Sequence, residues 1–227
     1  MTLPPAKPEA AETKQERTFA FVDLAGFTAL TEIHGDVEAA DLAERFTTLS
    51  RSVLQPDDQL VKSMGDAVML AFPGPDSALG ALARLIDACN QEPGFPSPRA
   101  GLHHGSAVER GGDWFGRSVN LTARVTDQAR GGQSLATSDV ADAARALELP
   151  TVALGCFEFH NLADAVELWD IAVAESPCCW FVDPVCRMRI ERNEAAGRLR
   201  YAEKDWWFCS LECASAFAQY PKRYAAK

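Results

Sequence analysis

Apolar and polar positions follow two different periods between residues 18 and 173, one typical of strands and one typical of helices. Short apolar runs, bounded by Gly, Pro or Asp, predict strands. Residues 98–110 contain a His-His-Gly sequence and predict a strand, a turn and a second strand. The other strands are expected at residues 18–23, 59–64, 67–72, 133–138, 151–159 and 166–173.

Helical spacing fills the segments between these strands. The helices are expected at residues 26–34, 37–54, 73–92, 116–132 and 139–147, the fourth of them closed by Gly131-Gly132. Strands that alternate with helices and also form hairpins indicate an α/β (α+β) fold with a mixed sheet. The fold class is therefore a mixed sheet flanked by helices.

The two ends of the chain differ from this central part. Residues 1–17 are rich in Pro, Ala and charge, which predicts a disordered tail. Residues 174–180 read as a linker, and residues 181–227 are rich in aromatic residues and cysteine. The expected organisation is a tail, a domain over 18–173, a linker, and a small cysteine-containing module over 181–227.

Composition limits the classes of function. The chain has 227 residues, 47% of them hydrophobic, and a net charge of −10. An acidic chain is a poor candidate for nucleic-acid or anionic-membrane binding. No apolar run reaches the length of a membrane span, and the N-terminus lacks the apolar segment of a signal peptide. A cytoplasmic protein with neither nucleic-acid nor membrane partners is expected.

Two aspartates stand where apolar strands end. Asp23 follows Phe21-Val22, and Asp66 lies in the Gly-Asp turn between two strands. A buried carboxylate without a partner is costly, and two carboxylates with phosphate oxygens suit Mg²⁺. The alternative is that each aspartate only caps its own turn.

Five segments in order resolve this choice: FVDLAGFTALTEIHGD, VKSMGDAVMLAF, RAGLHHGSAV, DWFGRSVNLTARV and VELWDI. Together they make residues 18–173 similar to the class III adenylate and guanylate cyclase catalytic domain. The resemblance implies a ferredoxin-like mixed sheet and conversion of ATP to cyclic AMP and pyrophosphate. It also implies a head-to-tail homodimer, with ATP bound at the interface between the two chains.

The same resemblance implies roles for single residues. Asp23, Asp66 and the backbone carbonyl of Leu24 would bind two Mg²⁺ or Mn²⁺ ions. Asn120 would orient the ribose, and Arg124 would stabilise the reacting phosphorus. Asn120 and Arg124 are four residues apart, so on a helix they share one face.

Lys62 and Asp113 fall on the positions that select the purine in this family. Lysine only donates hydrogen bonds and carboxylate only accepts them, which complements N1 and the N6 amine of adenine. Guanine has the reverse polarity, and a site of this kind can reject it by roughly 10⁴-fold. ATP is therefore expected as the substrate.

His160 is a departure from the family pattern. The triplet Phe159-His160-Asn161 stands where the family often has a lysine that reaches the terminal phosphates. His160 is accordingly a candidate phosphate ligand, or a surface histidine.

Residues 181–227 resemble the YHS domain, a small relative of metal-binding TRASH modules, through Asp-Pro-Val-Cys, Phe-Cys-Ser, and the later Cys, Phe, Pro and Tyr. Arg187 stands where the family commonly has glycine. Cys186, Cys209 and Cys213 could bind Zn²⁺ or Cu⁺, with Cys178 or Cys179 as a fourth ligand or an open position. They could instead be buried apolar residues in an aromatic core.

Two functions follow. The first is a homodimeric adenylate cyclase, regulated by metal at the C-terminal module. The alternative is a catalytically weak cyclase-like protein that senses metal and signals through partners.

Overall fold

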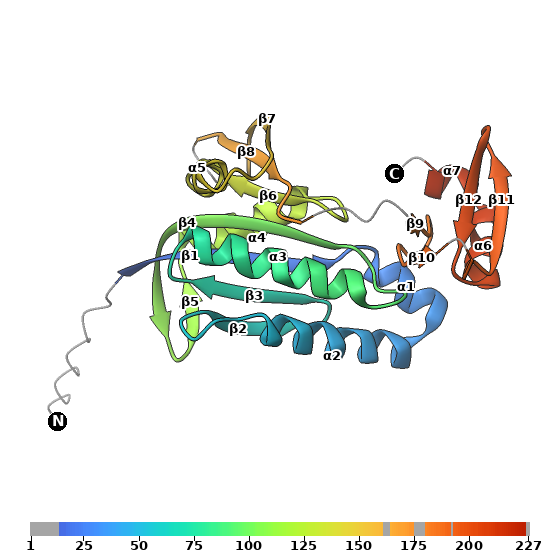
Figure 1. Cartoon of the computed structure of the whole chain (residues 1–227), viewed down its shortest axis with the longest axis horizontal. Helices are drawn as coiled ribbons and strands as arrows, with labels where there is room; N and C mark the ends of the chain where they lie inside the picture. Colours follow the sequence, from blue (N-terminus) through green and yellow to red (C-terminus); the bar gives the residue numbers. More distant parts are fainter. Residues whose placement is uncertain (1–13, 161–163, 175–179, 192, 226–227) are drawn as a thin grey trace, which may run out of the picture.

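A computed structural model describes residues 14–160, 164–174, 180–191 and 193–225. Its main body is an eight-stranded sheet in the order β2-β3-β1-β4-β6-β8-β7, with β5 paired to β4 (Figure 1). The β4–β6 pair is parallel and the other pairs are antiparallel, so the sheet is mixed. The strands are β1 (Lys14–Leu24), β2 (Gln59–Met64), β3 (Ala67–Phe72), β4 (Pro98–Arg110), β5 (Asp113–Phe115), β6 (Ser134–Thr137), β7 (Thr151–Phe157) and β8 (Val166–Ile171).

Helices cover both faces of this sheet. Strand β1 alternates its side chains: Ala20, Val22 and Leu24 enter the larger core, while Phe19 and Phe21 face the opposite side. Helix α4 covers that opposite side, where Thr126 donates to the Phe21 carbonyl. The helices of this domain are α1 (Phe27–His34), α2 (Asp36–Ser52), α3 (Pro75–Gln91), α4 (Arg117–Gln128) and α5 (Ser138–Ala146). The predicted fold class is confirmed.

The largest difference from the sequence prediction lies in β4. Residues 98–110 form one continuous strand, so the predicted division into two strands was wrong. Gly105 does not make a turn there. A side chain at Gly105 would meet the Ser118 hydroxyl at 2.6 Å, so glycine at this position lets α4 approach the sheet.

The other predicted boundaries of helices and strands differ only slightly from those in the structure. Strands β2 and β3 have their predicted bounds. Strand β1 begins at Lys14, so residues 14–17 belong to the sheet and not to a tail. The rest of the expected tail, residues 1–13, lies outside the described residues.

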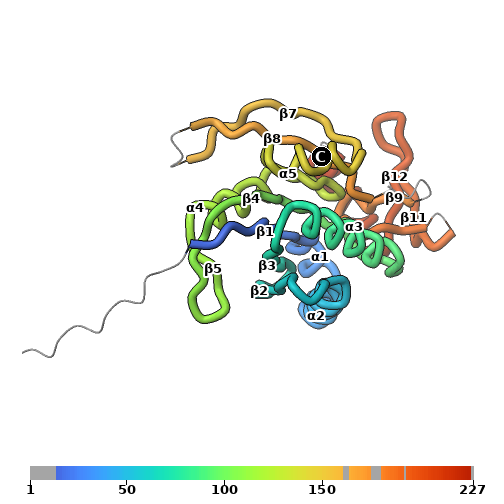
Figure 2. The backbone as a smooth tube through the Cα atoms, turned by 60° about the vertical axis from the view of Figure 1, so that its left-hand side comes forward, coloured from blue at the N-terminus to red at the C-terminus, as the bar shows by residue number. Residues whose placement is uncertain are grey.

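The C-terminal module consists of two short hairpins and two helices. Its elements are β9 (Trp180–Val182), β10 (Arg189–Glu191), β11 (Gly197–Tyr201), β12 (Lys204–Phe208), α6 (Leu211–Gln219) and α7 (Pro221–Ala225). Figure 1 shows these elements beyond the ends of α1 and α3, and Figure 2 shows β9, β11 and β12 on the right-hand side of the molecule. The buried residues Cys186, Phe208 and Phe217 belong to the same apolar cluster as the sheet, so the module shares its core with the main domain.

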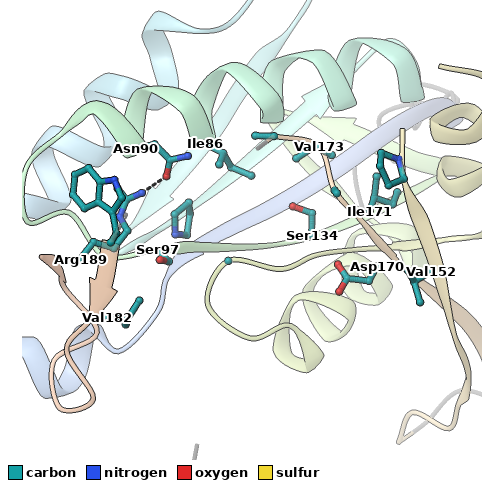
Figure 3. Close-up of a pocket in the computed structure, with 16 residues that line it drawn as sticks. Ile86, Asn90, Ser97, Ser134, Val152, Asp170, Ile171, Val173, Val182 and Arg189 are labelled. Carbon is teal, nitrogen blue, oxygen red and sulfur yellow. Dashed lines mark hydrogen bonds between the residues drawn. The ribbon is translucent and has the colours of Figure 1, made fainter. Parts of the chain in front are cut away.

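Arg189 fixes the module to the end of α3. It is buried, and its Nε atom donates to the Phe95 carbonyl at 2.9 Å. Its other guanidinium nitrogens donate to the Asn90 side chain and the Cys89 carbonyl. The guanidinium lies 5.2 Å from the ring centre of Trp180. Figure 3 shows Arg189 and Asn90 at one end of a cavity whose volume is about 370 Å³.

None of the helices in the described part of the chain has the length and hydropathy of a membrane span.

Candidate active site and metal centre

Asp23 and Asp66 lie side by side at one end of the sheet. Asp23 is near the end of β1, opposite Ala67 in the β1–β3 ladder. Asp66 is in the β2–β3 turn, where Gly65 adopts a φ of 66°. The Leu24 amide donates to the Asp66 carbonyl at 3.1 Å. Strand pairing therefore brings the two predicted aspartates together.

The surroundings of this pair suit a divalent cation. Burial, and then the neighbouring Asp23 carboxylate, raise the pKa of Asp66 to about 6. The Asp23 Oδ1 atom is buried and has no hydrogen-bond partner among the described residues. Buried polar atoms are almost always paired, and carboxylate oxygens are the ligands that Mg²⁺ and Mn²⁺ prefer. The residues present therefore fit such an ion.

Arg99 belongs to the same site, and sequence reasoning missed it. Arg99 pairs directly with Asp23 in the β1–β4 ladder. Its Nε atom donates to Asp23 Oδ2 at 2.8 Å, and its NH2 atom contacts the same oxygen. The signal that could have found Arg99 is the antiparallel pairing of the two strands, which sets it opposite Asp23.

Lys62 and Asp113 also lie together, as predicted. The Lys62 ammonium is 2.7 Å and 2.9 Å from the two carboxylate oxygens of Asp113. This hydrogen bond lowers the pKa of Asp113. Both side chains remain partly exposed, at 38% and 33%. A donor and an acceptor are thus offered to solvent at one point, between β2 and β5.

Helix α4 carries the other two predicted residues. Asn120 is exposed, and Arg124 lies one turn further along. The Arg124 guanidinium donates to the backbone carbonyl of His160, so the structure brings Arg124 and His160 together. The Asp23–Asp66 pocket, of about 340 Å³, is not lined by Lys62, Asp113, Asn120 or Arg124. The predicted catalytic residues therefore form separate groups within one chain.

The three predicted cysteines of the C-terminal module do converge. Sγ of Cys186 is 3.3 Å from Sγ of Cys209, which is 3.7 Å from Sγ of Cys213. The Nε2 atom of His34, from helix α1, lies 3.6 Å from Cys209 Sγ. All four ligand atoms lie within 4.8 Å of one another. Sequence reasoning missed His34, and its candidates Cys178 and Cys179 lie outside the described residues.

Polar contacts hold the cysteine-bearing segments in place. The buried carboxylate of Asp183 accepts from the Val185 and Cys209 amides, both at 2.8 Å. Ser210 caps α6 by accepting from the Cys213 amide at 3.1 Å. Hydrogen bonds from Cys186 and then Cys209 hold the pKa of the Cys213 thiol well below its usual range.

One arginine of the module reaches the aspartate pocket, and a second packs on the segment beside it. Arg187 has a φ of 65°, a conformation that glycine tolerates better. Its side chain packs on Gly26, where an added Cβ would lie 2.3 Å from Arg187 Cγ. Arg223 lines the same pocket as Asp23 and Asp66. The module is therefore in contact with the segment that follows Asp23.

Comparison with known proteins agrees with this picture. Residues 181–227 match the YHS domain. A pH-sensitive adenylate cyclase of Mycobacterium tuberculosis is 42% identical over 126 residues, which cover 56% of this chain and 32% of the relative. An adenylate cyclase of Streptomyces griseus is 38% identical over 110 residues, covering 48% of this chain and 28% of the relative. The chain thus spans about a third of the length of these curated relatives.

Solved structures with the same fold include cyclases of both kinds. The adenylyl cyclase CyaB from P. aeruginosa superimposes with a TM-score of 0.62 at 18% identity, covering 73% of this chain and 97% of CyaB. The guanylyl cyclase Cya2 gives a TM-score of 0.59 at 21% identity, covering 74% of this chain and 96% of Cya2. The N-terminal part of the chain has the class III nucleotide cyclase fold. The chain joins this cyclase-like part to a C-terminal YHS domain.

Proposed function

We propose that the protein is an adenylate cyclase that converts ATP to cyclic AMP and pyrophosphate. The observation that carries this proposal is the Asp23–Asp66 pair, in which a buried oxygen of Asp23 has no hydrogen-bond partner among the residues that the structure describes. The identity to named adenylate cyclases over about half of the chain supports the same activity.

Asp23, Asp66 and the Leu24 carbonyl would hold two Mg²⁺ or Mn²⁺ ions. When bound, these ions supply charge neutralisation at the triphosphate and activation of the ribose 3′-hydroxyl. Arg99 holds the Asp23 carboxylate through one oxygen, and the other accepts no hydrogen bond from residues 14–160, 164–174, 180–191 or 193–225. Arg99 thereby orients Asp23 toward the pocket.

Lys62 and Asp113 select adenine. Without a base they satisfy each other. Adenine offers an acceptor at N1 to the ammonium and a donor at N6 to the carboxylate. Guanine would set a donor against Lys62 and an acceptor against Asp113. ATP is therefore favoured over GTP, although adenylyl and guanylyl cyclases share the fold.

The complete site is shared by two chains. Within one chain, the aspartate pocket is lined by neither Arg124 nor Lys62. A head-to-tail homodimer brings the aspartates of one protomer to Asn120 and Arg124 of its partner. Apolar side chains suited to such an interface are exposed at Phe115 (53%), Val152 (61%) and Leu154 (41%).

At the shared site, Asn120 orients the ribose and Arg124 stabilises charge on the reacting phosphorus. The backbone carbonyl of His160 accepts from Arg124, and His160 is exposed; we assign its side chain to the terminal phosphates. Zn²⁺ or Cu⁺ at Cys186, Cys209 and Cys213 would regulate turnover through the contacts of the YHS domain with the aspartate pocket.

Turnover of ATP and of GTP by the purified protein with Mn²⁺ tests this function. The wild type should form cyclic AMP and strongly prefer ATP, and Asp23→Ala should be inactive with an unchanged circular dichroism spectrum. The absence of cyclic AMP from the folded wild type would favour the alternative, a cyclase-like protein that senses metal and acts through partners.

A further inference from the structure

We propose that His34 and the three cysteines form one four-coordinate Zn²⁺ centre shared by the cyclase-like domain and the YHS domain. The bound metal would then cross-link helix α1 to the C-terminal module. The new element is His34, which helix α1 contributes as the fourth ligand. It can be tested without any measurement of turnover.

Three of the six distances between the ligand atoms are close to those of a tetrahedral site. Zn–S bonds of about 2.3 Å and Zn–N bonds of about 2.0 Å give edges of roughly 3.8 Å between sulfurs and 3.5 Å from sulfur to nitrogen. The structure has 3.7 Å between Cys209 and Cys213, and 3.6 Å between Cys209 and His34. The Cys186–Cys209 distance of 3.3 Å needs a shift of only a few tenths of an ångström. Four ligand atoms within 4.8 Å leave room for one ion.

The donor set favours zinc over the harder ions of the aspartate site. Three sulfur atoms and one imidazole nitrogen form a closed Cys₃His set typical of structural zinc. Cys186 and Cys213 are fully buried, and Cys209 and His34 are half-buried. The Asp183 carboxylate binds the Cys209 amide, so it supports the ligand-bearing segment from outside the cluster.

The position of His34 connects the two sites. His34 is the last residue of α1, and α1 begins three residues after Leu24. At the other end of this segment, Arg187, the residue next to Cys186, packs on Gly26. Zinc at His34 would therefore hold both ends of the segment between Asp23 and α2 against the YHS domain. Metal at the cysteines would order the segment that follows the catalytic aspartate.

The experiment compares Zn²⁺ affinity and Co²⁺ spectra of the reduced full-length protein with those of three variants. We expect one Zn²⁺ per chain and the intense absorption of a tetrahedral Co²⁺–thiolate centre. His34→Ala should lower Zn²⁺ affinity by at least about tenfold, because even the loss of an outer-shell partner of a ligand costs about 10- to 100-fold. His34→Cys should restore tight binding with a four-thiolate spectrum. His104→Ala, which removes a histidine bound to Thr18 in the sheet, should behave as the wild type.

A second measurement is the hydrogen exchange of backbone amides. Zn²⁺ should slow amide hydrogen exchange of residues 27–34 in the wild type and in His34→Cys, but not in His34→Ala. Equal Zn²⁺ affinity and an unchanged Co²⁺ spectrum in His34→Ala would overturn the proposal. Binding of Cu⁺ with no affinity for Zn²⁺ would overturn it too, as would isolation of Cys186 and Cys209 only as a disulfide. If the protein binds Zn²⁺ as expected but makes no cyclic AMP, the proposed cyclase function fails and the proposed zinc centre stands.

Discussion

Arg99 lies directly opposite Asp23 across the β1–β4 ladder, and its guanidinium holds one oxygen of the Asp23 carboxylate. The other oxygen is buried and has no partner within the described part of the chain. This relationship explains how a chain can place a carboxylate at the end of a core strand. Asp23 is paired with an arginine through one oxygen, and its other oxygen is the one that the proposed cation would bind.

Replacing Arg99 tests this arrangement. Arg99→Met keeps the apolar stem of the side chain and removes the charge that orients Asp23 and lines the aspartate pocket. We expect kcat/KM for ATP to fall by about 10²-fold, the scale of losing one preorganised charged donor. Mn²⁺ affinity should not fall, because a nearby positive charge is removed. Steady-state kinetics with varied ATP and Mn²⁺ measure both, and an unchanged kcat/KM would contradict the role.

The raised pKa of Asp66 predicts a pH dependence of metal binding. Protonated Asp66 cannot bind the ion, so the Mn²⁺ affinity should fall as the pH drops below about 6 and level off above it. Calorimetric titration between pH 5 and pH 8 measures this. A flat affinity over that range would show that Asp66 is not a ligand.

Asp66 also affects the stability of the metal-free protein, and this effect has the opposite dependence on pH. Because folding raises the pKa of Asp66 from 3.8 to about 6, the folded state binds more protons in that interval. Its stability should therefore decrease as pH rises from about 4 to about 6. Asp66→Asn should lose this part of the pH dependence in urea unfolding with a chelator present. An identical pH profile in the variant and the wild type would argue against the assignment.

The Lys62–Asp113 pair predicts the choice of base. Asp113→Asn supplies both a donor and an acceptor where the carboxylate supplies only acceptors, so guanine is no longer opposed at that point. We expect the ratio of kcat/KM values for ATP and GTP to fall at least about tenfold. Asp205→Asn, a change of the same kind in the YHS domain, is the matched control and should keep the ratio. A full preference for ATP in Asp113→Asn would mean that adenine is read elsewhere.

The buried hydrogen bonds of Arg189 predict that this side chain stabilises the attachment of the YHS domain to the main domain. Arg189→Ala leaves the Phe95 and Cys89 carbonyls without their donor in a buried place. We expect the free energy of unfolding to fall by about 2–4 kcal/mol, because each unsatisfied group costs about 1–3 kcal/mol. Arg200→Ala removes an exposed pair with Glu203 and should change it by less than about 1 kcal/mol. Urea unfolding of the zinc-loaded proteins compares them, and equal effects would contradict the anchoring role.

The sequence predicted those features that are encoded locally. Apolar runs and a Gly-Asp turn define β2, β3 and the position of Asp66. The spacing of Asn120 and Arg124 placed both on one helix. The family resemblance assigned Lys62 and Asp113 to one base-binding site, and the hydrogen bonds between their side chains show that they lie together.

The features that were missed depend on contacts between distant segments. Arg99 is an ordinary strand residue until β4 is paired with β1. His34 meets Cys209 across 175 residues, and nothing near His34 in the sequence resembles a metal motif. Gly105 was read as a turn, although it serves the close approach of α4. In each case tertiary packing gives the residue its role.

Mixing two inactive variants tests the central claim, an adenylate cyclase whose site is built from two chains. Asp23→Ala and Arg124→Ala should each be inactive alone, since every site then lacks one essential residue. Coexpressed in equal amounts, they should form heterodimers with one complete site, and recover about a quarter of the wild-type cyclic AMP production. A mixture as inactive as its parents, from variants that fold and dimerise, would contradict the account.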